Sequence, residues 1–209
     1  MTRRDYIDTL VFDFDGVIAD TEPPHWRSWA TILEPMDICF TWEQYCEIGR
    51  GVSDAQMIDK LWQLGQDRSK LTGLEERNAL RKGIMQDLCK SNPPIPESTV
   101  EMLHSLKGYC LGLATSSAIS DVAPLLRAAG IYQCFDALVF GNDVVRHKPA
   151  PDPYILLSDR LGVKTGLAFE DSDAGIVSAQ QARFVAIHIA EPEQLSLIVY
   201  RELSERHPF

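Results

Sequence analysis

The chain has 209 residues, a net charge of -10 and a sequence pI of about 4.9. This length can bury a real core and lies between one large domain and two small ones. The acidic surface argues against a nucleic-acid or anionic-membrane partner, because negative charges would repel it. A small anionic ligand is still possible, since such a ligand responds to the charges of its own site.

The cysteines predict a reducing compartment, and therefore a cytoplasmic protein, because they are scattered and show no C-x-x-C spacing. We see no signal peptide in the first residues, and no run approaches the roughly 18 apolar residues of a membrane span. We expect a monomer or a weak dimer. The five cysteines are Cys39, Cys46, Cys89, Cys110 and Cys134.

The first predicted element is a strand over residues 9–15, TLVFDFD, which is apolar until it reaches its two aspartates. Residues 21–90 show helical periodicity and no strand pattern. The segment SNPPIPES at 91–98 then breaks the helix with three prolines. The sequence therefore predicts a helical segment inserted after the first strand, over the sheet edge where open α/β sheets bind ligands, in the position of a lid.

From residue 91 onward, strand patterns alternate with helix patterns. Apolar strands separated by helices indicate a parallel sheet that is covered on both faces. We therefore predict an α/β protein: a Rossmann-like parallel sheet core over residues 1–20 and 91–209, with an α-helical cap domain inserted over residues 21–90. The predicted strands are 109–117 (ending in a polar loop), 137–140, 166–171 and 184–190.

Three helix starts in this half are predicted from capping residues. Ser98 and Glu101 have the spacing of a capping box. Ser120 or Asp121 is the expected N-cap of a helix that ends at Gly130, and Asp152 the expected N-cap of a helix that Gly162 ends.

The carboxylates of Asp13 and Asp15 follow the first strand one residue apart. Residues i and i+2 of a strand face the same way, so the two acids should point together and repel each other unless a cation lies beside them. Ordinary turn chemistry is one explanation, because Asp favours turns and Gly16 follows. A calcium loop of the EF-hand type is excluded by Val17, Ala19 and Pro24 at its ligand positions. A divalent-metal site with a catalytic carboxylate is the third interpretation.

The later strands also end in polar residues. Thr115, Ser116 and Ser117 offer hydroxyl and N–H groups to an anion, although such residues also serve as ordinary caps. Lys148 precedes Pro149 and so lies in extended or turn backbone, where most lysines are simply solvated. Together they would bring hydroxyls and one cation to the edge of the sheet that carries the acids.

Glu170 and Asp171 end the strand before the last one. Acidic residues are common at such ends, but with the acids of the first strand they could share a Mg²⁺ ion, which binds carboxylates together with phosphate oxygens. Lys148 and the ion would then neutralise the charge gathered at this edge.

Four segments resemble the motifs of the haloacid dehalogenase superfamily: DFDGVIADTE, LATSSA, HKPAPDPY and EDSDAGI. Their order, with a helical insert after the first, is similar to subfamily I members with a helical cap, a group that includes phosphatases and β-phosphoglucomutase. The resemblance runs from about Thr9 to Ile189.

This resemblance implies a role for each matching residue. Asp13 would be the nucleophile that forms an aspartyl-phosphate, and Asp15 would be the general acid and base. Thr115 would hold the transferring phosphoryl group, with Ser116 and Ser117 beside it, and Lys148 would pair with that group and with Asp13. The implied Mg²⁺ ligands are the carboxylates of Asp13 and Asp171, the backbone carbonyl of Asp15, and Glu170 in a supporting position.

Two departures from the mutase favour a phosphatase for a small phosphorylated metabolite, such as a sugar phosphate. Asp54 and Ala118 stand where β-phosphoglucomutase has cations that contact a second phosphate. A charge-paired contact of this kind is worth about 2–5 kcal/mol. A phosphosugar mutase is the alternative reading. A non-catalytic protein that binds a phosphorylated ligand is a second alternative, and it fits less well because every catalytic position is filled.

Three residues of the insert are candidates for substrate binding. Arg50 lies between two glycines, Gly49 and Gly51, which would permit close approach of a ligand, but it could equally be a solvated loop arginine. His25 resembles a histidine at the cap hinge of the mutase, and packing is the competing explanation.

In the predicted core, Arg183 takes a position where glycine would suit a left-handed turn.

Overall fold

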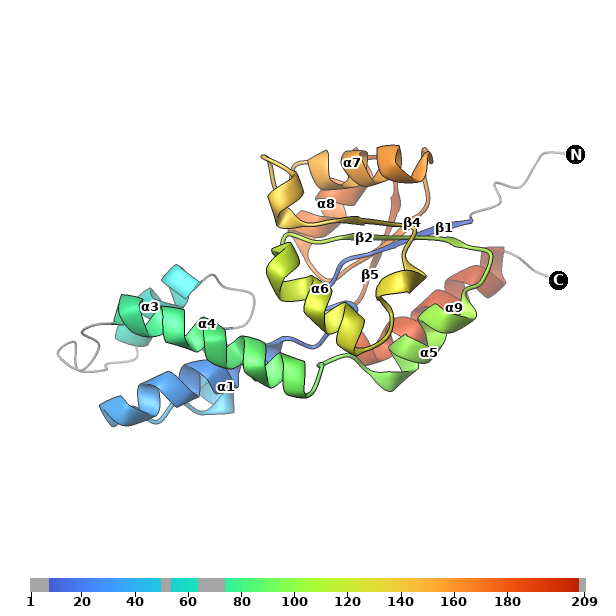
Figure 1. The fold of residues 1–209 in the computed structure, drawn as a ribbon. Helices are drawn as coiled ribbons and strands as arrows, with labels where there is room; N and C mark the ends of the chain where they lie inside the picture. Colours follow the sequence, from blue (N-terminus) through green and yellow to red (C-terminus); the bar gives the residue numbers. More distant parts are fainter. Residues whose placement is uncertain (1–7, 50–53, 64–73, 207–209) are drawn as a thin grey trace, which may run out of the picture. The chain divides into compact units, whose positions relative to one another are not determined.

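The chain folds into two units (Figure 1). The computed structural model describes residues 8–49, 54–63 and 74–206. One unit, here called the core unit, comprises residues 1–20 and 93–209; the other, the helical unit, comprises residues 21–92. Among the described residues, no helix has both the length and the apolar composition needed to cross a bilayer.

The core unit contains one parallel sheet of five strands in the order β3-β2-β1-β4-β5. The first strand is therefore central, and the chain moves to one side of it for two strands before it crosses to the other side. The point where the order reverses lies between β1 and β4, which is where sheets of this type bind ligands. The strands are β1 Thr9–Phe12, β2 Cys110–Ala114, β3 Ala137–Val139, β4 Leu167–Glu170 and β5 Val185–His188.

Helices cover both faces of this sheet, which confirms the predicted α/β architecture. Helices α7 and α8 pack on one face, and α5, α6 and α9 lie on the other (Figure 1). Residues that alternate along a strand face opposite layers, so Val11 and Ala168 pack toward α7 and α8 while Phe12 stacks on Phe169 on the other side. The helices are α5 Glu97–Ser105, α6 Ile119–Ala128, α7 Asp152–Leu161, α8 Asp173–Gln181 and α9 Leu195–Arg206.

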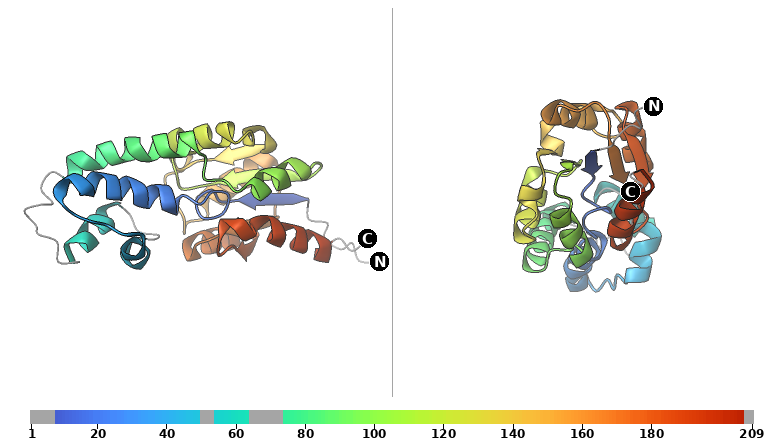
Figure 2. Two further views of the ribbon diagram at one scale, coloured as in Figure 1. Left: turned by 90° about the horizontal axis from the view of Figure 1, so that it is seen from below. Right: turned by 90° about the vertical axis from the view of Figure 1, so that its right-hand side faces the viewer.

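The described part of the helical unit consists of helices and connecting segments. Its helices α1 and α4 lie side by side (Figure 2). A separate apolar core fills this unit, and Trp29, Tyr45 and Leu61 are completely buried in it. The helices are α1 Glu22–Leu33, α2 Trp42–Ile48, α3 Asp54–Gln63 and α4 Leu74–Ser91.

The two chain segments that connect the units run next to each other. The N–H group of Asp20, at the end of the first core segment, donates to the carbonyl oxygen of Pro94 at 2.8 Å. The insert therefore leaves and re-enters the core unit at one place, between β1 and β2.

The predicted helix caps were wrong in three places, although the helices themselves form. Helix α5 begins at Glu97 after Pro96, α6 begins at Ile119 after Ala118, and α7 begins at Asp152 after Pro151. A preceding proline or alanine provides no side-chain acceptor, so these helices begin one or two residues earlier than their best capping side chains would place them. Helix α9 was not predicted.

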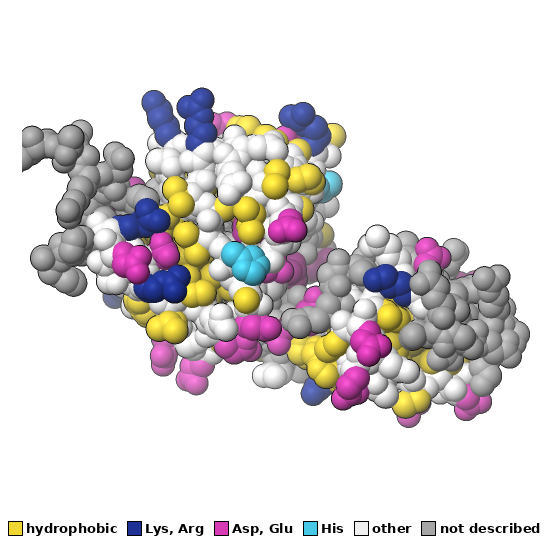
Figure 3. Space-filling model, turned by 180° about the vertical axis from the view of Figure 1, so that it is seen from behind, with side chains coloured by type: hydrophobic (Ala, Val, Ile, Leu, Met, Phe, Trp, Pro, Cys, Tyr) yellow, Lys and Arg dark blue, Asp and Glu magenta, His cyan; other side chains and the backbone are white. Residues whose placement is uncertain are grey.

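The surface carries both signs of charge. On the face drawn in Figure 3, acidic side chains lie on both units, and lysine and arginine side chains are dispersed among acidic and apolar ones. Negative charge on this face is therefore not confined to one unit.

Candidate active site

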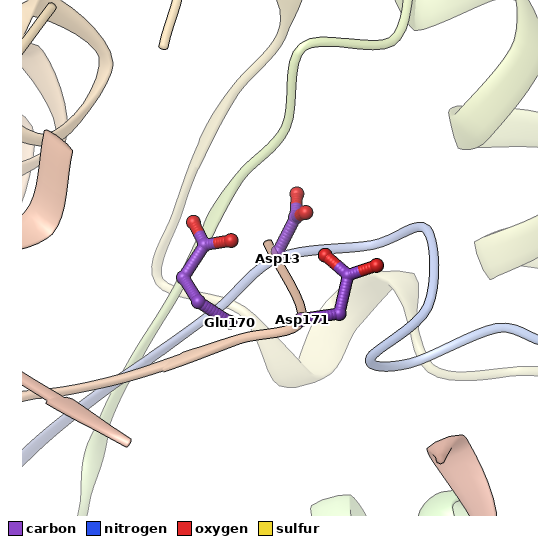
Figure 4. A group of neighbouring side chains, drawn as sticks. All are labelled: Asp13, Glu170 and Asp171. Atoms are coloured by element: carbon purple, nitrogen blue, oxygen red, sulfur yellow. The ribbon is translucent and has the colours of Figure 1, made fainter. Parts of the chain in front are cut away.

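Three carboxylates meet at the reversal point of the sheet. Asp13 follows β1, Glu170 ends β4, and Asp171 comes next. Each offers an oxygen, and these oxygens lie within 4.8 Å of one another. In Figure 4 the three side chains project to the same side of the two strand ends. The pairing of β1 with β4 therefore brings Asp13 to the consecutive acids Glu170 and Asp171.

Lys148 is the cation of this group. Its ammonium nitrogen lies 2.6 Å from Oε1 of Glu170 and 2.9 Å from Oδ1 of Asp13, and it donates to the carbonyl oxygen of Ala114 at 2.9 Å. The side chain is only 5% exposed. One buried positive charge therefore faces two buried carboxylates, with Asp171 as a third negative group beside them.

The excess of negative charge changes the proton affinities of the group. Burial, and then the Asp13 carboxylate, raise the pKa of Glu170 to about 8, against the opposing effect of Lys148. The surrounding protein atoms, and then Asp13, raise the pKa of Asp171 to about 6, although this residue keeps contact with solvent. Burial alone would lower the pKa of Lys148, but Asp13 and Glu170 outweigh it and raise this pKa. The site thus favours an additional positive charge.

The hydrogen bonding of the carboxylates also favours an additional positive charge at the site. Oε2 of Glu170 is buried without a hydrogen bond, whereas Oδ1 of Asp13 has the ammonium nitrogen of Lys148 at 2.9 Å. Buried oxygens of this kind are costly unless a partner satisfies them. The possible ligand atoms are all oxygens, which suits a hard divalent cation. The residues therefore fit a metal ion.

Two glycines make room for the carboxylates. A Cβ atom at Gly16, whose φ is 71°, would lie 2.2 Å from Oδ2 of Asp171. A Cβ atom at Gly175, in the first turn of α8, would lie 1.9 Å from Oε2 of Glu170. Any side chain at either position would displace an acid of the group.

Asp15 lies beyond the end of β1 at Phe12, where the chain turns back between Phe14 and Ala19. Its carboxylate accepts a hydrogen bond of 2.6 Å from the hydroxyl of Ser117. The loop after β2 therefore holds the second predicted acid.

The loop after β2 is held by its own residues. The hydroxyl oxygen of Thr115 accepts from the N–H of Ser117 at 3.0 Å, and Thr115 is buried, whereas Ser116 is exposed. The carbonyl of Ser117 accepts from the N–H of Gly141 at 2.9 Å. Ser117 thus contacts the Asp15 carboxylate from a loop that Thr115 helps to hold.

Among the candidates in the insert, Arg50 and Gly51 lie outside the described residues, and His25 belongs to a hydrogen-bonded chain inside the helical unit. The indole N–H of Trp29 donates to Nε2 of His25 at 3.3 Å, and Nδ1 of His25 lies 2.7 Å from the hydroxyl oxygen of Tyr45. The Tyr45 hydroxyl donates to Glu22. Because an indole can only donate and a carboxylate can only accept, this chain assigns a neutral His25 with its proton on Nδ1.

Tyr154 and Gly175 were not identified from the sequence. Tyr154, in the first turn of α7, donates its hydroxyl hydrogen to Oε1 of Glu170, and its ring lies 5.5 Å from the ammonium of Lys148. Burial, and then the Glu170 carboxylate, raise the pKa of Tyr154 well above its usual value, so it remains a donor. A glycine inside the helix after EDSDA was a usable signal of close packing. No comparable signal distinguished Tyr154 from an ordinary core tyrosine.

Comparisons with known proteins agree with this architecture. The haloacid dehalogenase-like hydrolase family matches residues 10–189. The fructose-1-phosphate phosphatase YqaB of Escherichia coli is 31% identical over 185 residues, covering 86% of this chain and 95% of that protein. The β-phosphoglucomutase of Bacillus subtilis is 24% identical, covering 94% of this chain and 90% of that enzyme.

A solved structure extends the likeness to three dimensions. The crystal structure of a hydrolase of subfamily IA from Geobacter sulfurreducens superimposes with a TM-score of 0.75 at 20% identity, covering 94% of this chain and 96% of that one. The match to the family profile spans both units and all five strands of the sheet. This chain therefore belongs to the haloacid dehalogenase-like hydrolase family.

Proposed function

We propose that this protein is a Mg²⁺-dependent phosphatase that hydrolyses a small phosphorylated sugar through an aspartyl-phosphate. The observation that carries this proposal is the grouping of Asp13 with Lys148, Glu170 and Asp171 at the reversal point of the sheet. The E. coli relative acts on fructose 1-phosphate, and a Thermotoga maritima relative that is 30% identical is named a phosphorylated carbohydrates phosphatase. Both names support a phosphosugar as the substrate.

In this mechanism Asp13 is the nucleophile. A carboxylate oxygen of Asp13 attacks phosphorus, the bond from phosphorus to the sugar oxygen breaks, and Asp15 gives its proton to that oxygen. Water then attacks the phosphorus of the aspartyl-phosphate, Asp15 takes a proton from it, and inorganic phosphate leaves while the Asp13 carboxylate is restored. The hydrogen bond from the hydroxyl of Ser117 holds the Asp15 carboxylate for both steps.

The other residues bind and orient. Asp13, Asp171 and Glu170 would hold Mg²⁺, with the carbonyl of Asp15 as a further ligand. The ion, when bound, neutralises negative charge on the phosphoryl oxygens. Lys148 keeps the Asp13 carboxylate in place and pairs with the phosphoryl group, while Thr115, Ser116 and Ser117 bind it with hydroxyl and N–H groups. Positioning and charge neutralisation of this kind supply most of the acceleration in phosphoryl transfer.

The test is release of inorganic phosphate from a panel of sugar monophosphates, with and without Mg²⁺. We expect turnover that EDTA abolishes and that Asp13→Asn does not support. Binding of the panel without turnover by the wild-type chain would instead favour a non-catalytic phosphate-binding protein.

The relation to the B. subtilis mutase makes a phosphosugar mutase the alternative. Ala118, which follows Ser117, offers no positive charge to a second phosphate, and this favours the phosphatase. Conversion of β-glucose 1-phosphate to glucose 6-phosphate in the presence of the bisphosphate, without net release of phosphate, would favour the mutase. Roles for His25, Arg50 and Gly51 in substrate binding, and for the helical unit as a lid, stay predictions.

A further inference from the structure

Tyr154 and Glu170 form a completely buried hydrogen-bonded pair. Both side chains are 0% exposed. Oε1 of Glu170 receives the hydroxyl hydrogen of Tyr154 and also lies 2.6 Å from the ammonium of Lys148. Oε2 of the same carboxylate is buried and has no hydrogen bond. The protein therefore engages one oxygen of Glu170 twice and leaves the other without a hydrogen bond.

Packing explains the ring of Tyr154 but not its hydroxyl. The ring belongs to the apolar cluster under α7 and α8 and lies 5.6 Å from the ring of Phe184, a place that phenylalanine would fill as well. A buried hydroxyl is unfavourable unless it is hydrogen-bonded, and here the partner is a charged group of the site. The same ring lies beneath the ammonium of Lys148. Tyr154 thus touches two charged members of the site and nothing in this arrangement requires its oxygen for the core.

The second oxygen of Glu170 lies against the first turn of α8 and fits there because Gly175 has no side chain; a Cβ atom at Gly175 would be only 1.9 Å away. The contacts of Oε1 with Tyr154 and Lys148 restrict the rotation of the Glu170 carboxylate, and this fixes the position of Oε2. Groups that orient a ligand in this way commonly determine the affinity of a metal site.

We propose that Tyr154 is a positioning residue whose hydroxyl orients the Glu170 carboxylate so that Oε2 is available to a divalent cation. This inference rests on the proposed Mg²⁺ site and adds to it a residue that acts through Glu170 rather than on the substrate. It predicts that the hydroxyl of Tyr154 affects binding of the metal ion even when no substrate is present.

The experiment is titration calorimetry of Mg²⁺ into the substrate-free chain. We expect Tyr154→Phe to weaken Mg²⁺ binding about 10- to 100-fold, the usual effect of losing a group that orients a metal ligand. Tyr200→Phe is the matched control, because it removes a tyrosine hydroxyl that bonds Ser105 in the same unit, and it should bind as the wild type does. If the wild-type chain binds no Mg²⁺, the proposed function fails. If it binds and Tyr154→Phe binds equally well, only the inference about Tyr154 fails.

A double-mutant comparison separates orientation of Glu170 from a general structural effect. In a Glu170→Gln background, Tyr154→Phe should cause no further loss of Mg²⁺ affinity, since the residue it acts through has already lost its charge. An equal loss in both backgrounds would overturn the inference. Tyr154→4-aminophenylalanine keeps a donor on the same ring and should restore binding; binding as weak as that of Tyr154→Phe would contradict the inference. This third variant also decides the question if thermal melts show that Tyr154→Phe is unfolded.

Discussion

The two units of this chain bury polar groups in contrasting ways. In the core unit, Asp13, Lys148 and Glu170 set buried charges against one another, and Oε2 of Glu170 is left without a hydrogen bond. In the helical unit, His25 and Tyr45 join a chain of hydrogen bonds in which each donor meets an acceptor.

The charged group of the core unit is therefore suited to bind a ligand, whereas the hydrogen-bonded chain of the helical unit joins side chains to one another. A buried group with more negative than positive charges favours binding of a cation. A chain in which each donor has an acceptor instead fixes the side chains that form it. Substitutions in the core unit should therefore alter catalysis, ion binding and pH dependence. Substitutions in the hydrogen-bonded chain of the helical unit should alter stability and the tautomer of His25.

The largest expected effect is on turnover. Asp13→Asn removes the proposed nucleophile, and we expect kcat to fall on the order of 10⁴-fold or more. Phosphate release from the best sugar monophosphate measures it. Asp159→Asn, an exposed substitution on α7, is the control and should leave kcat unchanged. A loss of less than about tenfold, equal to about 1.4 kcal/mol, would remove Asp13 from that role.

The next effect is on stability of the core unit. Lys148→Met leaves two buried carboxylates without their cation, and we expect the free energy of unfolding to fall by about 3–5 kcal/mol. Urea denaturation in EDTA measures the change. Lys164→Met, at an exposed position, should have little effect. Equal stability of the two variants would show that the buried charges are not paired as described.

The excess of acids should also make stability depend on pH. The pKa of Glu170 is raised from 4.5 to about 8 and that of Asp171 from 3.8 to about 6, so the folded chain holds these protons more tightly than the unfolded chain. Their contribution to stability is therefore full below pH 4 and is lost as the pH rises through about 6 and about 8.

Urea denaturation in EDTA from pH 5 to pH 8.5 tests this, with Glu170→Gln as the comparison. The wild type should lose more stability than the variant across this range, and saturating Mg²⁺ should reduce the difference. A steeper loss in Glu170→Gln would contradict the assignment.

A smaller effect is expected in the helical unit. Tyr45→Phe breaks the link between His25 and Glu22, and the loss of a buried hydrogen bond should cost about 1–3 kcal/mol. Hydrogen exchange of α1 and α2 would report this loss, and ¹⁵N NMR should show that the tautomer of His25 is no longer fixed on Nδ1. Tyr132→Phe in the core unit is the control. An unchanged His25 spectrum in Tyr45→Phe would refute the proposed direction of the hydrogen bonds.

The smallest expected effect is an increase in the free energy of unfolding. Arg183 has a φ of 71°, which confirms the left-handed turn expected at this residue, and such a conformation costs most residues about 1–2 kcal/mol. Arg183→Gly should therefore raise stability by about 1 kcal/mol. Asp37→Gly is the matched change in the helical unit, where φ is 55°, and it should gain less because aspartate tolerates this conformation better. A larger gain at Asp37 would reverse the comparison.

Much of the fold could be predicted because its signals are local. Apolar runs such as LVF and LAF mark buried parallel strands, and helical periodicity marked the insert. Helix starts were less predictable, since Pro96 and Pro151 precede helices whose nearest capping residues lie inside the first turn. Helix boundaries depend on the tertiary context as well as on capping chemistry.

The candidate site was partly predictable for a topological reason. Carboxyl ends of parallel strands meet at one edge, so Asp13, Lys148 and Glu170 could be placed together from the order of the strands. The hydrogen bond between Ser117 and Asp15 could not, because it depends on how the loop after β2 folds. The hydroxyl of Tyr154 could not either, since its partner lies 16 residues away in the chain and only the packing of α7 on the sheet brings them together.

The hydrogen bond between Asp20 and Pro94 has a consequence for how such chains diversify. Seventy-odd residues between them begin and end at one junction, so their removal would leave a gap that a short turn could close at a small entropic cost. Recombination at this junction can exchange one insert for another without disturbing a strand.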